Sequence, residues 1–180
     1  MGSRNYLIEG VSGTGKTSVA EELQRRGYHV IHGDRSLAYR GDPLTGLPLE
    51  PAAAEDAADR AAWVNKHWIW PVDKVRSLAA DQGRPTTFFC GGSRNWQRFI
   101  DVFDGVFVLE IDRDTLLRRL AGRPADEFGG RPAERQLIVQ LHESKEDVPQ
   151  GAVVIDATAP LEQVVDAILS QCGAAHQAGR

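Results

Sequence analysis

Eight residues near the amino terminus have the types and spacing of a phosphate-binding loop, and they read Gly10-Val11-Ser12-Gly13-Thr14-Gly15-Lys16-Thr17. They match the pattern G-x-x-x-x-G-K-[ST] at every required position. Glycines in this pattern let backbone N–H groups point at phosphate oxygens. Lys16 would reach the β- and γ-phosphates, and the Thr17 hydroxyl would bind Mg²⁺. We therefore expect residues 10–17 to bind a nucleoside triphosphate.

The residues on either side of this loop predict the structure that it requires. The apolar run Tyr6-Leu7-Ile8 before it is typical of a strand. Apolar residues after it recur at helical spacing, and Gly27 is suited to end that helix. A helix that starts at the loop adds the positive end of its dipole to the phosphate site.

A second set of polar residues follows two other predicted strands. Asp34 is the best candidate for a general base or a water-mediated Mg²⁺ ligand, because an acceptor hydroxyl needs a nearby carboxylate. Arg35 is the next candidate for the acceptor site. Gly91-Gly92 follows the strand at 86–90, and Arg94 could hold an anionic substituent. We expect these residues to meet, since parallel strands end at one edge of the sheet.

Arginines at a helix-to-loop junction could neutralise a transferring phosphoryl group. Arg119 and Arg123 bracket this junction around Gly122. Arg131 follows Gly129-Gly130, which predicts a hinge that could bring this side chain in on closure. The other interpretation is a solvated arginine face.

The elements expected around these residues alternate along the chain. Strands are predicted at 5–9, 28–32, 86–90, 105–111 and 152–155. Helices are predicted at 16–26, 52–70 and 72–80, from Asp112 or Asp114, and from Pro160 through Leu169, with a frayed tail from about 173. This alternation indicates an α/β fold, with a parallel sheet and helices on both faces.

The stretch between the second and third of these strands contains three tryptophans. Trp63 and Trp70 would share one face of the predicted 52–70 helix, with Trp68 nearby. Core packing and a wall over the acceptor are both consistent with this pattern. Lys66 and His67 could point into the same site. Cys90 is interpreted as a small packing residue.

Length and composition restrict the class of protein. The chain has 180 residues, which predicts one domain, and its formal net charge of -4 argues against a general nucleic-acid or membrane-surface protein. Two distant cysteines favour a reducing compartment without disulfides. With no membrane-length apolar run, and with a strand at the amino terminus where a signal peptide would be, we expect a cytoplasmic protein. The oligomeric state is not predicted.

Other users of a phosphate-binding loop fit less well. A GTPase needs Asn-Lys-x-Asp, and Asn65-Lys66-His67-Trp68 has no Asp at its fourth position. A motor ATPase needs an apolar strand that ends in acidic residues, and Val106–Glu110 has this outline. The chain is short for the helical lid domain that usually accompanies such a motor.

The motifs together resemble the small P-loop kinases, the group of nucleoside monophosphate, shikimate and gluconate kinases and related antibiotic phosphotransferases. The resemblance covers most of the chain, and its segments are Gly10–Thr17, His32-Gly33-Asp34-Arg35, Cys90-Gly91-Gly92, Val108–Arg131 and Ile155–Pro160. It implies a three-layer P-loop NTPase fold with a five-stranded parallel sheet, a short Arg-rich lid at about 119–133 and an acceptor-binding helical region at about 35–82. It also implies ATP and Mg²⁺ as cofactors, with Thr158 and Pro160 near the adenine.

The sequence departs from the nucleoside monophosphate kinases, because it has no clear Asp-Gly-x-Pro-Arg segment and its lid is short. We therefore expect an ATP- and Mg²⁺-dependent phosphotransferase whose acceptor is a nucleoside or nucleotide, or a small hydroxylated metabolite or antibiotic. The alternative is a P-loop ATPase or a nucleotide-binding regulatory protein that acts through a protein partner.

Overall fold

The computed structural model describes residues 3–51 and 56–178, with side chains described up to residue 173. Its centre is a sheet of five parallel strands in the order β2-β5-β1-β6-β7. The strands are β1 Arg4–Glu9, β2 His29–His32, β5 Thr86–Cys90, β6 Gly105–Glu110 and β7 Val153–Asp156. The prediction of an α/β fold with a five-stranded parallel sheet is confirmed.

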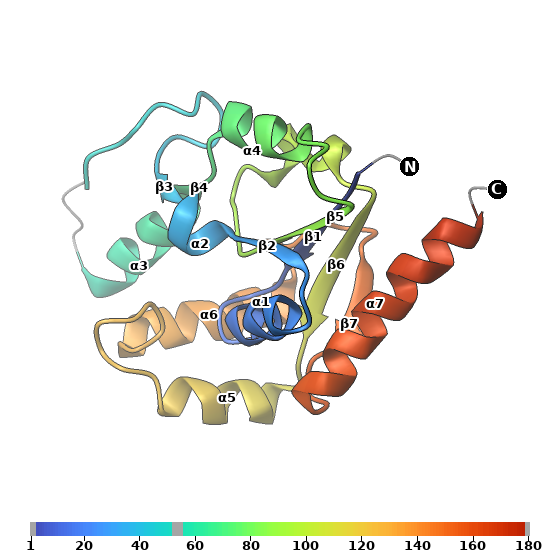
Figure 1. Ribbon diagram of the computed structural model, residues 1–180. Helices are drawn as coiled ribbons and strands as arrows, with labels where there is room; N and C mark the ends of the chain where they lie inside the picture. Colours follow the sequence, from blue (N-terminus) through green and yellow to red (C-terminus); the bar gives the residue numbers. More distant parts are fainter. Residues whose placement is uncertain (1–2, 52–55, 179–180) are drawn as a thin grey trace.

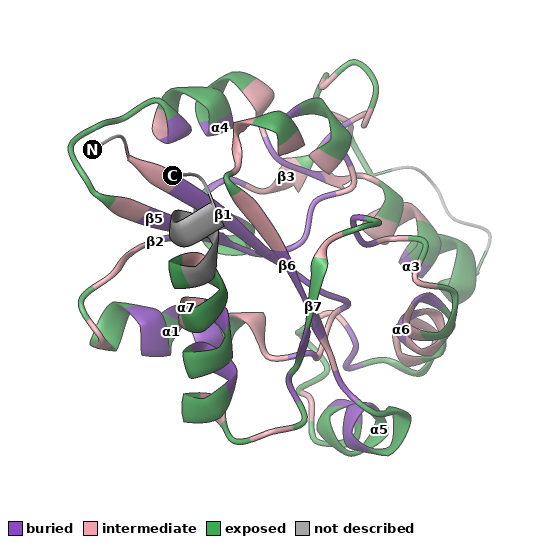
Figure 2. Ribbon diagram, turned by 90° about the vertical axis from the view of Figure 1, so that its right-hand side faces the viewer, coloured by how far each residue is buried: buried purple, intermediate pink, exposed green. Residues whose placement is uncertain are grey.

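Both faces of the sheet are buried, because successive strand residues point to opposite sides and are apolar on each. Tyr6 and Ile8 face one core with helices α1 (Lys16–Arg25) and α7 (Leu161–Ala178). Leu7 and Phe89 face the other core, under α4 (Val72–Ala79). Figure 1 shows α4 above the sheet and α1 and α7 below it, and Figure 2 shows the buried residues concentrated between them.

The predicted lid at about 119–133 covers the end of one helix, the loop after it and the start of a second helix. Helix α5 (Arg113–Ala121) begins where Asp112 accepts a hydrogen bond from the Thr115 N–H at 2.8 Å. Residues 122–131 then lead into α6 (Pro132–Ser144), a helix that the sequence analysis did not predict. Helix α6 packs beside α3 (Ala57–Lys66), so the lid and the predicted acceptor region share a boundary.

The prediction of one helix over 52–70 is wrong in part. Helix α3 covers 57–66, and β4 (Trp68–Ile69) then pairs antiparallel with β3 (Tyr39–Arg40); residues 52–55 lie outside the described residues. Trp70 therefore does not share a helix face with Trp63. It is fully buried and stacks on Phe99 at 5.9 Å between ring centroids. Tertiary packing around Trp70 and strand pairing at Trp68-Ile69 overrode the local helical pattern.

Two smaller differences concern the ends of elements. Asp34 lies in a single helical turn, α2 (Gly33–Ser36), which the sequence analysis did not predict after the strand at 28–32. The last helix continues to Ala178 instead of ending at 169, so the predicted frayed tail from 173 is wrong for residues 173–178. Its apolar residues Val164, Val165 and Ile168 lie in the core that contains β1 and α1, and this packing anchors the helix.

Candidate active site

The phosphate-binding loop has the backbone that its glycines predict. Gly13 and Gly15 have φ values of 93° and 103°, in the left-handed region that favours glycine. Gly15 precedes the first residue of α1, so the amino terminus of that helix faces the loop. A Cβ at Gly10 would lie 2.9 Å from the backbone oxygen of Leu109. The loop therefore requires glycine both for its turn and for its contact with β6.

The Lys16 side chain curls over this loop. Its Nζ donates to the carbonyl oxygens of Gly10 at 2.5 Å and Val11 at 3.2 Å. Burial lowers the pKa of Lys16, and the carboxylates of Asp34 and Glu9 oppose that shift. The ammonium group thus lies in a partly desolvated position between two acidic groups, where an anionic phosphate would stabilise its charge.

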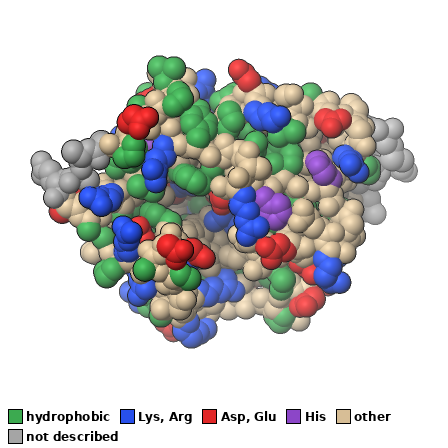
Figure 3. All heavy atoms as spheres, turned by 60° about the vertical axis from the view of Figure 1, so that its left-hand side comes forward, with side chains coloured by type: hydrophobic (Ala, Val, Ile, Leu, Met, Phe, Trp, Pro, Cys, Tyr) green, Lys and Arg blue, Asp and Glu red, His purple; other side chains and the backbone are tan. Residues whose placement is uncertain are grey.

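Two cavities meet at the carboxyl edge of the sheet. The smaller, about 470 Å³, is lined by the phosphate-binding loop, by Arg119 and by the start of α7. The larger, about 840 Å³, lies between α3, α6 and the loop at 122–131. Figure 3 shows the molecule hollowed on this side, with basic and apolar side chains around the hollow. Four residues line both cavities: Ser12, Lys16, Asp34 and Arg123.

Asp34 is fixed through one of its two carboxylate oxygens. Its Oδ1 accepts hydrogen bonds from the Gly92 N–H at 3.0 Å and from Trp68 Nε1 at 3.2 Å. Among the described residues nothing donates to Oδ2, which is free to accept a proton or to contact a hydrated cation. A Cβ at Gly91 would lie 2.9 Å from Oδ1, so this glycine allows the close approach.

The three lid arginines occupy different positions. Arg119 lines the smaller cavity and donates to the carbonyl oxygens of Gly13 at 3.2 Å and Ala157 at 3.3 Å. Arg123 donates to Ser12 Oγ at 2.7 Å and lines both cavities. Arg131 is exposed and lines only the larger cavity. Arg119 and Arg123 therefore contact the phosphate-binding loop directly, and Arg131 does not.

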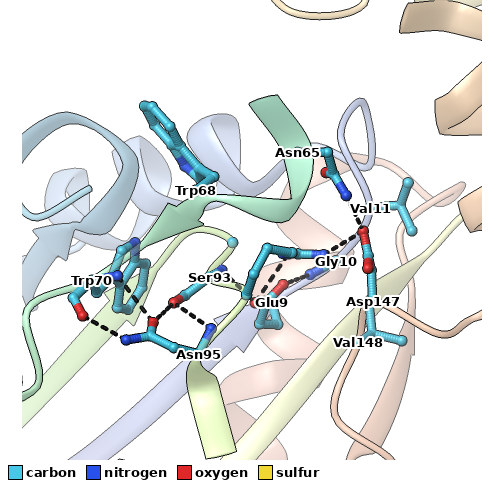
Figure 4. Close-up of polar contacts among 12 residues, drawn as sticks. Glu9, Gly10, Val11, Asn65, Trp68, Trp70, Ser93, Asn95, Asp147 and Val148 are labelled. Atoms are coloured by element: carbon cyan, nitrogen blue, oxygen red, sulfur yellow. Dashed lines mark hydrogen bonds and ion pairs between the residues drawn. The ribbon is translucent and has the colours of Figure 1, made fainter. Parts of the chain in front are cut away.

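Arg94 lies between two carboxylates at the floor of the larger cavity. Its guanidinium is 2.6 Å from Asp147 and 3.7 Å from Glu9. Asp147 also accepts from Asn65 of α3 at 2.6 Å, a pair that Figure 4 shows pointing toward each other. Arg94 therefore ties these segments together while it lines the larger cavity, and its role toward an anionic substituent stays a prediction.

Glu9 joins the phosphate-binding loop to the turn after β5. It is fully buried and accepts from the Gly10 N–H at 2.9 Å and the Ser93 N–H at 2.8 Å (Figure 4). Burial raises the pKa of Glu9, and Arg94 and Lys16 oppose that shift. Glu9 thereby holds the Gly91-Gly92 turn in register with the start of the phosphate-binding loop.

The residues present fit a magnesium ion held jointly with phosphates. Thr17 and Asp34 both line the smaller cavity and offer a hydroxyl and a carboxylate oxygen. Mg²⁺ at such sites keeps several waters and takes few protein ligands besides phosphate oxygens. Within the described ranges no three His, Cys, Asp or Glu side chains are grouped so that they could hold a metal by themselves.

A comparison with known protein families assigns the chain to one of them. A family model described as "AAA domain" matches residues 7–140. The chain belongs to this family of P-loop domains. No curated protein matches the chain. Across the described residues, no helix is both long and apolar enough to span a membrane.

Two solved structures of kinases share the fold of this P-loop domain. A sugar kinase from Janibacter sp. HTCC2649 is 21% identical, with 93% of each chain covered and a TM-score of 0.54. A shikimate kinase from Bacteroides thetaiotaomicron is 15% identical, with 94% of this chain and 98% of that chain covered and a TM-score of 0.60. At these identities the likeness concerns the fold.

Some predicted residues lie away from the cavities of the P-loop domain. Arg35 is exposed and pairs with Glu21 at 3.6 Å. Thr158 and Pro160 line neither cavity, and Thr158 Oγ1 accepts from the Asp112 N–H at 3.2 Å. Their neighbours line the smaller cavity instead, and these are Ala157, Ala159, Leu161 and Val164. The predicted loop thus borders the smaller cavity, but through different side chains.

The tryptophans differ in role, since one belongs to the core and another lines the predicted acceptor site. Trp70 is core, while Trp68 lines the larger cavity and binds Asp34. Lys66 and His67 line neither cavity. Cys90 is buried, and burial raises the pKa of its thiol, which stays protonated as a packing group.

Sequence reasoning missed Glu9, Asn65 and Asp147. The position of Glu9 could have been recognised from the sequence. It is an acidic residue at the end of a buried strand, directly before the phosphate-binding loop, and a buried carboxylate needs hydrogen-bond or charged partners. Asn65 and Asp147 are 82 positions apart, and no local pattern predicts their contact.

Proposed function

We propose that this chain is a kinase that uses ATP and Mg²⁺ to phosphorylate a hydroxyl group of a small molecule. The observation that carries this proposal is that two cavities meet at Ser12, Lys16, Asp34 and Arg123. A kinase needs two adjoining binding sites with cationic groups and a carboxylate at their junction. The smaller cavity would bind ATP, and the larger would bind the acceptor.

On the nucleotide side, the backbone of residues 10–17 would bind the phosphates. Ala157, Ala159 and Val164 would contact the adenine, so that the loop containing Thr158 and Pro160 supports the base through its neighbours. Thr17 and Asp34 would hold Mg²⁺, which would neutralise charge on the phosphate oxygens. Asp34 would contact the ion through a water molecule.

At the junction, Asp34 would accept the proton of the attacking hydroxyl through its free Oδ2. Lys16 and Arg123, which line both cavities, would neutralise the transferring phosphoryl group, and Arg119 would support the phosphate-binding loop. Residues 119–133 would close as a lid and exclude water, which would otherwise attack ATP. The region 35–82 would supply α3 and Trp68 to the acceptor site, next to Asp34.

The experiment that tests this proposal is a mass-spectrometric screen of nucleosides, sugars, hydroxy acids and antibiotics with ATP and Mg²⁺. A product 80 Da heavier than one acceptor, formed by the wild type and not by Lys16→Ala, is expected. Persistent absence of any product while ATP binds would contradict the proposal.

The family description favours a second candidate, an ATPase or a nucleotide-binding regulatory protein that acts through a protein partner. Turnover separates the two, because a kinase hydrolyses ATP slowly alone and transfers quickly with its acceptor. One residue opposes the motor type of ATPase. Glu110, the candidate strand-end acid, pairs with Lys145 at 3.3 Å and lines neither cavity.

A further inference from the structure

The acceptor proposed above is restricted by the wall of the larger cavity. On this wall Val64 of α3 is partly exposed, and Ala61 of α3 with Ile138 and Leu141 of α6 form the buried apolar layer behind it. Phe128 from the lid loop adds an aromatic ring. A polar molecule placed against this wall would lose hydrogen bonds to water without replacing them.

Trp68 places a second aromatic ring next to the reacting carboxylate. Its Nε1 donates to Asp34 at 3.2 Å, and its backbone oxygen accepts from the Arg94 N–H at 2.8 Å. The backbone and the indole of Trp68 are therefore each held by a hydrogen bond while this residue lines the larger cavity. A flat group bound beside Asp34 would stack on a ring that is already oriented.

Most polar groups of the same cavity are already paired with one another. Asn65 and Arg94 both bind Asp147, and Asp56 accepts the Ala58 and Asp59 N–H groups at the start of α3. Glu134 accepts from the Gly129 and Arg131 N–H groups. A polyol with hydroxyls along its whole length would find few free partners in the interior. Three exposed arginines also line the cavity, Arg40, Arg60 and Arg131.

We infer that the acceptor is an alcohol with a flat, aromatic or heteroaromatic body, and not a simple polyol or hydroxy acid. Its ring would lie between Trp68 and the apolar wall, and its hydroxyl would reach Asp34. The inference rests on the proposed function, so binding and phosphoryl transfer are measured separately below.

Isothermal titration calorimetry with a non-hydrolysable ATP analogue and Mg²⁺ present tests the inference. The probes are adenosine and thymidine, p-nitrophenyl-β-glucoside, and then gluconate, shikimate and glycerol. At least one ring-bearing probe is expected to bind ten times more tightly than each of the other three. Comparing the affinities of adenosine and thymidine with that of p-nitrophenyl-β-glucoside distinguishes a nucleoside acceptor from an aromatic glycoside.

Two variants of helix α3 test whether the ring-bearing probe binds in the larger cavity. Val64→Asn puts an amide into the apolar wall, and it is expected to weaken the ring-bearing probe about tenfold. Ala62→Asn is the matched control, because Ala62 is exposed on the same helix and lines neither cavity. Nucleotide affinity should be unchanged in both variants, which shows that they fold.

Tryptophan fluorescence gives a readout that does not depend on the wall variants. The ring-bearing probe should quench the emission of the wild type and of Trp96→Phe, and the quenching should be lost in Trp68→Phe. Tighter binding of gluconate or shikimate, or no binding by any ring-bearing probe, would overturn the inference. Ring binding without phosphoryl transfer to the bound probe would support the preference of the cavity for an aromatic ring and would contradict the role of that probe as acceptor, whereas the kinase activity itself is tested by the screen above.

Discussion

The two cavities of this molecule are built in opposite ways. The smaller one is lined mainly by one continuous stretch, residues 12–19, whose backbone is shaped by glycines such as Gly13 and Gly15 and would supply the N–H donors to phosphate. The larger one is lined mostly by residues between Asp34 and Asp147, which come from two helices, a strand end and the lid, and it reaches the phosphate-binding loop at Gly10, Val11, Ser12 and Lys16. Backbone geometry can be encoded locally, whereas a wall of side chains needs the complete fold.

This difference predicts how each cavity responds to change. Substitutions in the phosphate-binding loop should remove nucleotide chemistry altogether. Substitutions around the larger cavity should change acceptor affinity and turnover by degrees, because several segments share the contacts. The expected effects below run from the largest to the smallest.

Lys16→Ala should have the largest effect. It removes the one charged side chain of the phosphate-binding loop, and transfer should fall about a thousandfold or more. The measurement is ATP-dependent product formation with the acceptor found in the screen. Lys74→Ala on α4 is the control, because Lys74 is exposed and lines neither cavity.

Asp34→Asn should lower turnover without changing the affinity for ATP. The amide keeps the size of the side chain but cannot accept the proton, so kcat should fall about a hundredfold. Affinity for ATP without Mg²⁺ should be unchanged, which calorimetry can check. Unchanged turnover would remove Asp34 from the reaction.

Gly130→Ala should damage the lid. A Cβ at this position would overlap the carbonyl oxygen of Pro124, a backbone atom that cannot rotate away. We expect transfer to fall about tenfold or more, with a larger share of ATP hydrolysed to water. Gly122→Ala in the same loop is the control, since a Cβ there would meet nothing within 4 Å. Equal activity of both variants would contradict a role for the lid.

Asp147→Asn should affect the larger cavity alone. It removes the charge that pairs with Arg94 and leaves the contact with Asn65 available. We expect the KM for the acceptor to rise about tenfold, while the KM for ATP stays the same. A matching rise in both constants would show that the two cavities are not separable in this way.

Glu22→Gln on α1 should have the smallest effect, and only on stability. Hydrogen bonds from Arg25 and Arg26 lower the pKa of Glu22 to about 2 from its ordinary 4.5. Its contribution is therefore full above pH 4.5 and is lost as the pH falls toward 2. The melting temperatures of the wild type and the variant should differ at neutral pH and converge in acid. Glu21→Gln, at an exposed neighbouring position, should show little difference at either pH.

The fold was predictable because its signals are local and repeated. The five strands are short apolar runs, and each lies within two residues of its predicted bounds. The stretch at 52–70 is one place where local signals failed. An Ala-rich helical pattern continued through Trp68 and Trp70, but pairing with Tyr39-Arg40 and stacking on Phe99 decided those residues.

The sequence by itself determined the phosphate-binding loop, the parallel sheet and the edge at which polar residues collect. These follow from glycine conformation, apolar patterning and the direction of parallel strands. Only the tertiary structure decided that Arg94 is held between Glu9 and Asp147, that Trp68 binds Asp34 and that α3 faces α6. Those contacts join residues that are 34 or more positions apart, and side-chain packing, which has no sequence period, selects them.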